Sequence, residues 1–264
     1  NDQIFGFGGT FRPHQLDIIT TVLSNVDCYI IMPTGGGKSL CYALPAVLSP
    51  GVTIVISPLL SLIEDQVASL LRLKCGGIPA AYLTSTNTNS QKNAILEDLY
   101  RPRRGLEPFL KLLYITPERL VKDKDTQNIL NDLYQNERLS RFIIDESHCV
   151  SAWGHDFRKD YGQLGCIKDM YPEAPVIALT ATACKKVSED TLKILKISDC
   201  KRFNTGYDRP NLLFEVREKT DKPSDHMKDI ANYILKGQFK GQTGIVYCMT
   251  RNDCEETASE LQKL

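Results

Sequence analysis

The sequence predicts an α/β fold, a doubly wound parallel sheet with helices on both of its faces. The first observation behind this prediction is a series of short apolar runs, at residues 28–32, 53–57, 80–83, 112–116, 142–145 and 176–180. The second observation is that amphipathic stretches, such as 59–73 and 185–195, lie between most of these runs. Unbroken apolar strands that alternate with helices are typical of a parallel sheet buried on both faces.

A second α/β domain is predicted to follow the first. The alternation pauses in a loop at residues 203–211, which contains Gly206 and Pro210. It resumes with a predicted strand, helix, strand and final helix, at 212–216, 227–235, 244–248 and 254–261. We therefore expect a first domain at residues 1–205 and the beginning of a second at 206–264. Because the chain starts without a methionine and stops inside an amphipathic pattern, we expect a piece of a longer protein.

Composition narrows the class of protein. The 264 residues are 42% hydrophobic and 24% charged, which is ordinary for a globular domain and excludes a disordered tail, a collagen-like fibre or a coiled-coil rod. No apolar run approaches the roughly 20 residues of a membrane helix, so we expect no membrane contact. The 32 basic and 32 acidic residues cancel, which argues against a large basic surface but permits a local basic groove. The nine cysteines include no C-x-x-C pair, so we expect no zinc and a reducing compartment.

The strongest chemical signal is the segment Ile-Ile-Met-Pro-Thr-Gly-Gly-Gly-Lys-Ser at residues 30–39, a strand followed by a glycine loop and a helix. Backbone N–H groups of such a loop surround phosphate oxygens, and the helix directs its positive end at them. The predicted nucleotide-binding residues are Thr34, Gly35, Gly36, Gly37, Lys38 and Ser39. We expect Lys38 to reach the terminal phosphates and the Ser39 hydroxyl to bind Mg²⁺. Met32 occupies the first glycine of the strict pattern, and a flexible glycine turn is the alternative interpretation.

Two carboxylates follow the apolar run at 142–145, in the sequence Asp145-Glu146. Because active groups collect at the carboxyl ends of parallel strands, we expect this pair to lie beside the glycine loop. Asp145 is predicted to hold Mg²⁺, and Glu146 is predicted to orient and deprotonate the attacking water. The alternative is a solvated helix start, which is the usual role of an Asp-Glu pair after a strand.

These motifs, together with several others, resemble a RecQ-family DNA helicase, from about residue 5 to residue 264. The family pattern appears as Phe11-Arg-Pro-His-Gln15, Met32-Pro-Thr-Gly-Gly-Gly-Lys-Ser39, Ser57-Pro-Leu59, Asp65-Gln66, Thr116-Pro-Glu118, Asp145-Glu-Ser-His148, Trp153-Gly-His-Asp-Phe-Arg158, Thr180-Ala-Thr182 and Arg209-Pro-Asn-Leu212. The Phe-Arg-x-x-Gln and Trp-Gly-His-Asp-Phe-Arg elements are the most specific to the family.

The resemblance implies RecA-like folds for both domains, with ATP and Mg²⁺ as cofactors. It implies a DNA-stimulated ATPase that couples hydrolysis to 3′–5′ movement on single-stranded DNA and to duplex unwinding, in DNA repair and recombination. Single-stranded and forked DNA are the implied partners. The implied location is the nucleus if the source is eukaryotic, and otherwise the cytoplasm.

By the same resemblance, Gln15 reads adenine and Arg12 stacks on the base. A glutamine amide can donate and accept in one bidentate contact with adenine N6 and N7, which favours ATP over GTP. An exposed residue at a helix start is the alternative for Gln15. The Phe-Gly pairs at residues 5–6 and 7–8 do not have the usual spacing before Phe11, so either aromatic could complete the adenine site.

The resemblance also assigns the DNA-binding and coupling residues: Ser57, Thr116, His148, Trp153, His155, Phe157, Arg158, Thr180 and Thr182. Trp153 is the only tryptophan and lies among aromatic and cationic side chains, which offer bases a stacking surface and phosphates a partner. The alternatives are a core tryptophan, and ordinary strand-to-helix capping for the hydroxyl residues. Ser147 and Ala152 differ from common family forms.

Two other functions compete with the helicase. A phosphate-loop kinase or a signalling GTPase would share the glycine loop. Neither class of protein is expected to have an adenine-reading glutamine or the Trp-Gly-His-Asp-Phe-Arg element. A truncated, non-catalytic fragment that binds nucleotide and DNA is favoured by the absence of the helicase arginine-rich motif from this sequence. The RecQ zinc region and winged helix are also absent from it.

Overall fold

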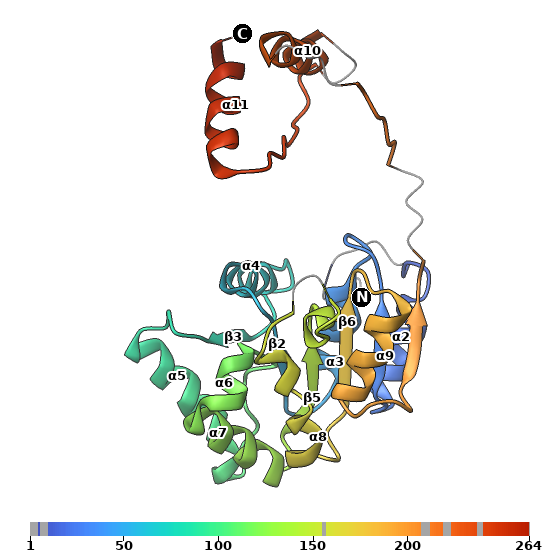
Figure 1. Cartoon of the computed structure of the whole chain (residues 1–264). Helices are drawn as coiled ribbons and strands as arrows, with labels where there is room; N and C mark the ends of the chain where they lie inside the picture. Colours follow the sequence, from blue (N-terminus) through green and yellow to red (C-terminus); the bar gives the residue numbers. More distant parts are fainter. Residues whose placement is uncertain are drawn as a thin grey trace. The chain divides into compact units, whose positions relative to one another are not determined.

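The computed structural model describes residues 5, 10–154, 157–206, 212–218, 223–236 and 240–263. The chain divides into two compact units, Asn1–Asp208 and Arg209–Leu264, which are considered separately (Figure 1). The domain boundaries expected from the sequence, 1–205 and 206–264, stay predictions. Within the described ranges, no helix is both long enough and apolar enough to cross a bilayer.

Seven parallel strands form a single sheet in the first unit (Figure 1). Their order across the sheet is β3-β4-β2-β5-β6-β1-β7. The strands are β1 (Cys28–Ile31), β2 (Val52–Ile56), β3 (Ala80–Leu83), β4 (Leu112–Ile115), β5 (Leu139–Ile144), β6 (Val176–Thr180) and β7 (Lys201–Asn204). All six predicted strands are confirmed, and β5 begins three residues earlier than expected.

Strand β7 was missed, because the sequence predicted a loop from residue 203. It lies at the edge of the sheet beside β1, and three of its four side chains are exposed. Its first two residues, Lys201 and Arg202, are basic. Charged side chains on an edge strand discourage pairing with another chain, and they also remove the apolar pattern from which strands are predicted.

Helices cover both faces of the sheet (Figure 1). One face packs against α2 (Gln15–Leu23), α3 (Lys38–Leu48) and α4 (Leu60–Leu71). The other packs against α5 (Asn89–Leu99), α6 (Pro117–Lys122), α7 (Lys124–Gln135), α8 (Cys166–Met170) and α9 (Lys185–Ile194). Short 3₁₀ turns lie at η1 (Arg101–Arg104), η2 (Ser147–Val150) and η3 (Tyr161–Gln163). The predicted doubly wound α/β class is confirmed.

Successive strand residues enter two separate hydrophobic clusters, one on each face. In β2, Ile54 packs on the α5–α9 side and Val55 on the α2–α4 side, and both side chains are fully buried. In β5, Ile144 and Ile143 divide in the same way. Two-sided burial explains why these strands are continuous apolar runs rather than alternating ones.

The second unit contains two described helices, α10 (Pro223–Lys236) and α11 (Arg251–Lys263). They confirm the helices predicted at 227–235 and 254–261. The strands predicted at 212–216 and 244–248 are wrong, because neither segment pairs with another strand in the part of the chain that is described. Their apolar side chains are exposed, with Phe214 at 87% and Tyr247 at 90%. An apolar run becomes a strand only where a neighbour supplies the ladder of hydrogen bonds.

Candidate nucleotide and DNA site

The glycine loop connects the end of β1 to the start of α3, as the sequence predicted. Gly35 and Gly37 have φ angles of 77° and 91°, a left-handed conformation that favours glycine. A Cβ on Gly36 would lie 2.5 Å from Cγ of Met32. Met32 is itself 2% exposed. Met32, the residue that departs from the strict motif, is therefore buried, and only a glycine fits against it at position 36.

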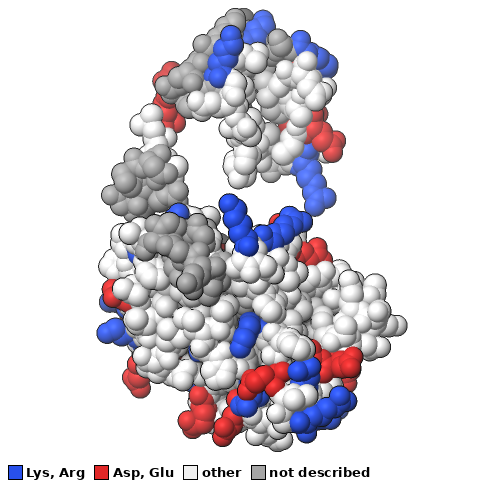
Figure 2. Space-filling model, turned by 180° about the vertical axis from the view of Figure 1, so that it is seen from behind, with Lys and Arg blue, Asp and Glu red and all other residues white. Residues whose placement is uncertain are grey.

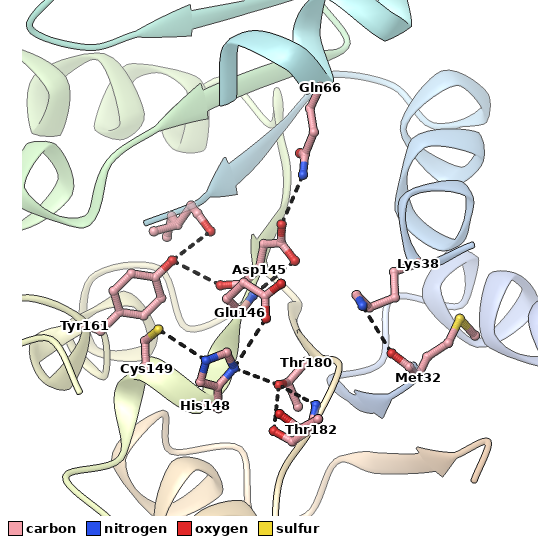
Figure 3. A network of polar contacts seen from close by, with 11 residues as sticks. Met32, Lys38, Gln66, Asp145, Glu146, His148, Cys149, Tyr161, Thr180 and Thr182 are labelled. Carbon is pink, nitrogen blue, oxygen red and sulfur yellow. Dashed lines mark hydrogen bonds and ion pairs between the residues drawn. The ribbon is translucent and has the colours of Figure 1, made fainter. Parts of the chain in front are cut away.

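Lys38 and Ser39 open helix α3. Its N-cap, Gly37, provides no side chain to cap the first turn, which leaves the positive helix end available to an anion. Nζ of Lys38 donates to the carbonyl oxygen of Met32 over 3.1 Å (Figure 3). The ammonium thus lies over the loop in which a phosphate would bind.

Gln15 and Arg12 hold the glycine loop from the side of α2. Gln15 is 3% exposed, and its Oε1 accepts from the backbone N–H of Arg12 over 2.9 Å. Its Nε2 donates to the carbonyl oxygens of Gly36 and Gly37, each over 3.4 Å. The Arg12 guanidinium donates to the carbonyl of Gly35. Gln15 is therefore not an exposed helix-start residue, and adenine recognition stays a prediction.

The aromatic residues expected near the adenine are only partly described. Phe5 is half-buried against the α2–α4 side of the core, and Phe11 packs against a small cluster between α2 and α3. Phe7 lies outside the described residues. The identity of the aromatic that completes the base site stays open.

Asp145 and Glu146 follow β5 and lie at the carboxyl end of the sheet (Figure 3). Asp145 is 5% exposed, and Oδ2 accepts from Nε2 of Gln66 over 3.3 Å. Burial, and then the charge of Glu146, raise the pKa of Asp145. A hydrogen bond from His148 lowers the pKa of Glu146, whose Oε2 lies 3.3 Å from the histidine Nδ1. Glu146 therefore stays ionised and can accept a proton.

Glu146 also has a strained backbone. Its φ of 47° and ψ of 46° are left-handed, a conformation that costs a non-glycine residue on the order of 1–2 kcal/mol. The conformation turns the chain sharply between β5 and the 3₁₀ turn η2. Strain of this kind collects at functional sites, where the surrounding structure holds it.

One cavity of about 540 Å³ joins these groups. Its lining is Thr10, Arg12, Gln15, Thr34, Gly35, Gly37, Lys38, Ser39, Leu40, Leu62, Gln66, Asp145 and Glu146. The volume is within the range of small-ligand and cofactor sites, roughly 300–1,000 Å³. The sequence predicted that the glycine loop and the two carboxylates lie at the same edge of the sheet. In the structure, both line this cavity.

The oxygen donors in the cavity fit a magnesium ion. Ser39 and Asp145 both line it and supply a hydroxyl and a carboxylate. Mg²⁺ usually takes one or two protein carboxylates together with phosphate oxygens and water. Within the described ranges, no group of three His, Cys, Asp or Glu side chains could hold a metal by itself. A donor set of this kind suits a metal that arrives with a nucleotide.

His148 connects the carboxylates to the end of β6. Its Nδ1 lies 2.9 Å from Oγ1 of Thr180, which in turn donates to the carbonyl oxygen of Thr182 over 3.0 Å (Figure 3). Hydrogen bonds with Cys149 and with Glu146 raise the pKa of His148 to about 10. Thr180 is buried and Thr182 is exposed, so this contact network runs from the cavity towards the surface.

The tryptophan loop lies on the surface. Trp153 is 64% exposed and Phe157 is 46% exposed, so the core alternative for Trp153 is wrong. Nη1 of Arg158 donates to the carbonyl oxygen of Pro58 over 2.7 Å, which ties the loop to the end of β2. His155 lies outside the described residues.

The two hydroxyl residues expected to touch the DNA backbone are less accessible. Ser57 is fully buried, and its Oγ has no hydrogen-bond partner among the described residues. Thr116 is half-buried at the N-cap of α6 and makes no side-chain cap. Contact between Ser57 and DNA would require this residue to be uncovered, and both roles stay predictions.

Several contacts were missed at the sequence level. Gln66 bonds Asp145 and also accepts from the Tyr42 hydroxyl over 3.2 Å. The Tyr161 hydroxyl donates to the carbonyl oxygen of Asp145 over 3.0 Å. Lys186 lies over the ring of Trp153. Only the Asp65-Gln66 pair carried a sequence signal, since it belongs to the family pattern, but that pattern assigned it no role.

Residues 12–190 match the DEAD/DEAH box helicase family. The chain is 42% identical to ATP-dependent DNA helicase Q1 from Rattus norvegicus over 254 residues, which are 96% of this chain and 40% of that protein. It is 45% identical to the RecQ-like DNA helicase BLM from Xenopus laevis over 253 residues, which are 96% of this chain and 18% of that protein. The chain thus spans less than half the length of these relatives.

Solved structures show the same fold. The DUF1998 helicase MrfA matches with a TM-score of 0.70 and 18% identity, over 98% of this chain and 39% of that one. A hypothetical ATP-dependent RNA helicase from Sulfolobus tokodaii matches with a TM-score of 0.54 and 17% identity, over 76% of this chain and 54% of that one.

The sequence matches confirm the predicted resemblance and exclude the kinase and GTPase alternatives. The family match covers the glycine loop, the Asp145-Glu146 pair and the tryptophan loop. This chain therefore belongs to the DEAD/DEAH box helicase family, and the relatives that it matches over most of its length are RecQ-type DNA helicases.

Proposed function

We propose that this chain is the ATP-binding part of a RecQ-type helicase that couples Mg-ATP hydrolysis to 3′–5′ movement on single-stranded DNA and to the unwinding of forked DNA. The observation that carries the proposal is the single cavity lined by both the glycine loop and the Asp145-Glu146 pair. A phosphate site beside an ionised carboxylate is the arrangement that phosphoryl transfer to water requires.

Each residue has a role in this proposal. Lys38 binds the terminal phosphates, and the loop N–H groups bind their oxygens. Ser39 and Asp145 would hold Mg²⁺, which neutralises charge on the phosphates when it is bound. Glu146, whose pKa is lowered by His148, orients water and accepts its proton.

The coupling between DNA and nucleotide runs through the His148 contacts. Nδ1 of the ring contacts both Oε2 of Glu146 and Oγ1 of Thr180. Trp153 follows on the same segment of chain, five residues later, and offers an exposed indole for base stacking. A DNA contact that shifts this segment would therefore move the histidine against Glu146.

The finer biological assignments rest on the RecQ-type relatives. The 3′–5′ polarity, a role in DNA repair and recombination, and a nuclear location in a eukaryotic cell are proposed on that basis. We propose single-stranded or forked DNA as the partner and assign no protein partner.

The non-catalytic alternative has one observation in its favour. Among the described residues that line the cavity, Arg12 is the only arginine, and its guanidinium is bonded to the loop carbonyl of Gly35. Hydrolysis in this enzyme class gains about 10³–10⁵ in rate from a free arginine at the transferring phosphate. The 264-residue chain by itself would then bind ATP and DNA with little turnover.

The test separates binding from hydrolysis with Glu146→Gln. In a protein that includes the rest of the second domain, this variant should bind Mg-ATP normally but lose at least about 100-fold in DNA-stimulated hydrolysis, because a general base contributes about 10²–10⁴. Glu97→Gln, an exposed residue of α5 outside the family motifs, is the matched control and should keep full activity. Unchanged turnover in Glu146→Gln would contradict the proposed base.

A further inference from the structure

A lysine covers the indole of the only tryptophan. Nζ of Lys186, in the first turn of α9, lies 3.1 Å from the centroid of the Trp153 ring. Both residues are exposed. A cation–π contact at an exposed site is weak, so another group that stacks on the ring can replace it.

Helix α9 also fixes the backbone beneath this ring. Oγ of Ser151 donates to Oδ2 of Asp190 over 2.6 Å, and the backbone N–H of Trp153 donates to the same Oγ over 3.2 Å. Asp190 and Lys186 are four residues apart on α9 and therefore share one face of the helix. The helix thus holds the loop through Asp190 and the ring through Lys186.

The residue after Trp153 packs closely on the preceding turn of the chain. Gly154 donates its N–H to the carbonyl oxygen of Ser151 over 3.0 Å. A Cβ on Gly154 would lie 2.6 Å from the carbonyl oxygen of His148. The chain next to Trp153 is therefore packed directly on the segment that carries the proposed coupling histidine.

The charge of Lys186 is available to a ligand. Its neighbour Lys185 lies 3.9 Å from Oε1 of Glu189, but Lys186 forms no ion pair with an acidic side chain of the described residues. Figure 2 shows the first unit from behind, where acidic and basic groups lie side by side at its lower end. Because the 32 basic and 32 acidic residues of the chain cancel, a DNA contact depends on a few local cations rather than on a broad basic field.

We propose that Lys186 is a DNA-contacting residue that exchanges partners when single-stranded DNA binds. A base takes its place on the Trp153 ring, and the freed ammonium binds the phosphate of the same nucleotide. The flexible four-carbon stem and three donors of lysine suit such a move. This inference rests on the proposed function, since it requires Trp153 to stack on DNA.

The exchange predicts a specific pattern in the fluorescence of Trp153. Because the chain has one tryptophan, all indole emission comes from this residue. Lys186→Ala should change the emission of the free protein, because the ammonium leaves the ring. With a saturating oligothymidylate, its emission should equal that of the wild-type complex, because a base covers the ring in both. Lys185→Ala is the matched control and should leave the free emission unchanged. Equal free emission in Lys186→Ala and wild type would overturn the proposal.

Salt dependence tests the phosphate contact. Binding of a fluorescein-labelled oligothymidylate is measured by anisotropy from low to moderate salt. In Lys186→Ala the slope of log K against log salt should be smaller by about 0.7, the value for one phosphate contact on a single strand. Lys186→Arg should restore both the slope and the ring contact, because arginine also stacks on indole. An unchanged slope in Lys186→Ala would overturn the phosphate contact.

Trp153→Ala, measured by the same anisotropy, separates this inference from the proposed function. Loss of a stacked base should weaken binding by about tenfold or more. If Trp153→Ala weakens binding while Lys186→Ala changes neither emission nor slope, only the lysine exchange is wrong. If Trp153→Ala binds as tightly as wild type, the proposed DNA contact of the loop is wrong as well.

Discussion

Nδ1 of His148 lies 2.9 Å from Oγ1 of Thr180, so the segment that follows β5 contacts the last residue of β6. The same nitrogen lies 3.3 Å from Oε2 of Glu146. One imidazole therefore bridges the proposed general base and the strand end that leads into α9. Because Lys186 of α9 also contacts Trp153, His148 and α9 lie between the proposed general base and the proposed DNA surface.

The charge of His148 should make stability depend on pH. Its pKa is raised to about 10 by hydrogen bonds with Cys149 and Glu146, against an unfolded value of roughly 6.5. A raised folded pKa stabilises the protein fully below pH ~6.5, and this stabilisation declines as the pH rises towards about 10. In urea unfolding, the deficit of His148→Gln relative to wild type should therefore be large at pH 6 and small at pH 9.5. A deficit that is constant over this range would contradict the charged histidine.

Removal of the loop ammonium should weaken nucleotide binding. Lys38→Ala should bind ATP at least about tenfold more weakly in calorimetry, because a charge-assisted hydrogen bond contributes ~1.5–3 kcal/mol. Lys74→Ala, an exposed lysine after α4, is the control and should bind normally. Equal affinities for Lys38→Ala and wild type would remove the glycine loop from the phosphate site.

Gln15 can act on the base or only on the loop, and competition between nucleotides distinguishes the two. Its amide is bonded to the carbonyls of Gly36 and Gly37. If it also reads adenine, Gln15→Ala should weaken the binding of ATP by a larger factor than the binding of GTP. If it only supports the loop, both nucleotides should weaken by the same factor. Displacement of a fluorescent ATP analogue by ATP and by GTP measures both.

The sheet and the glycine loop could be predicted because their signals are local. Six strands are continuous apolar runs, as expected of strands that a parallel sheet buries on both faces. The glycine loop can be recognised from the fixed spacing of its residues between a strand and a helix. Strand β7 escaped prediction because its exposed, basic residues have no apolar pattern. The segments at 212–216 and 244–248 have that pattern and are not strands, because pairing depends on neighbours rather than on the run itself.

The candidate site was predictable only in part, for a related reason. The sequence predicted which residue types would meet at the carboxyl ends of the strands, and Lys38, Ser39, Asp145 and Glu146 line one cavity. Contacts between side chains of distant segments, such as Gln66 with Asp145, leave no local pattern. They follow from tertiary packing, and only the structure reveals them.

The Gln66–Asp145 hydrogen bond leads to a prediction about metal dependence. Nε2 of Gln66 is a donor to the buried carboxylate at 3.3 Å and would orient it towards a metal. Gln66→Leu should raise by several-fold the Mg²⁺ concentration needed for half-maximal binding of a fluorescent ATP analogue, since loss of such a bond costs about 1–3 kcal/mol. Gln163→Leu, an exposed residue of η3, serves as the control. An unchanged Mg²⁺ requirement would mean that Gln66 does not position Asp145.

We expect the 264-residue chain to bind ATP but to hydrolyse it barely above background. The reason is that the cavity has no free arginine among its described lining residues. Arg12 is the only arginine among them, and its guanidinium is hydrogen-bonded to the carbonyl of Gly35. A version extended through the rest of the second domain should gain about 10³–10⁵ in DNA-stimulated turnover if that region supplies the missing cation. The measurement is phosphate release by both proteins with and without oligothymidylate. Robust DNA-stimulated turnover by the shorter chain would instead place the cation within it. Arg251→Ala and Arg209→Ala would then identify which residue supplies it.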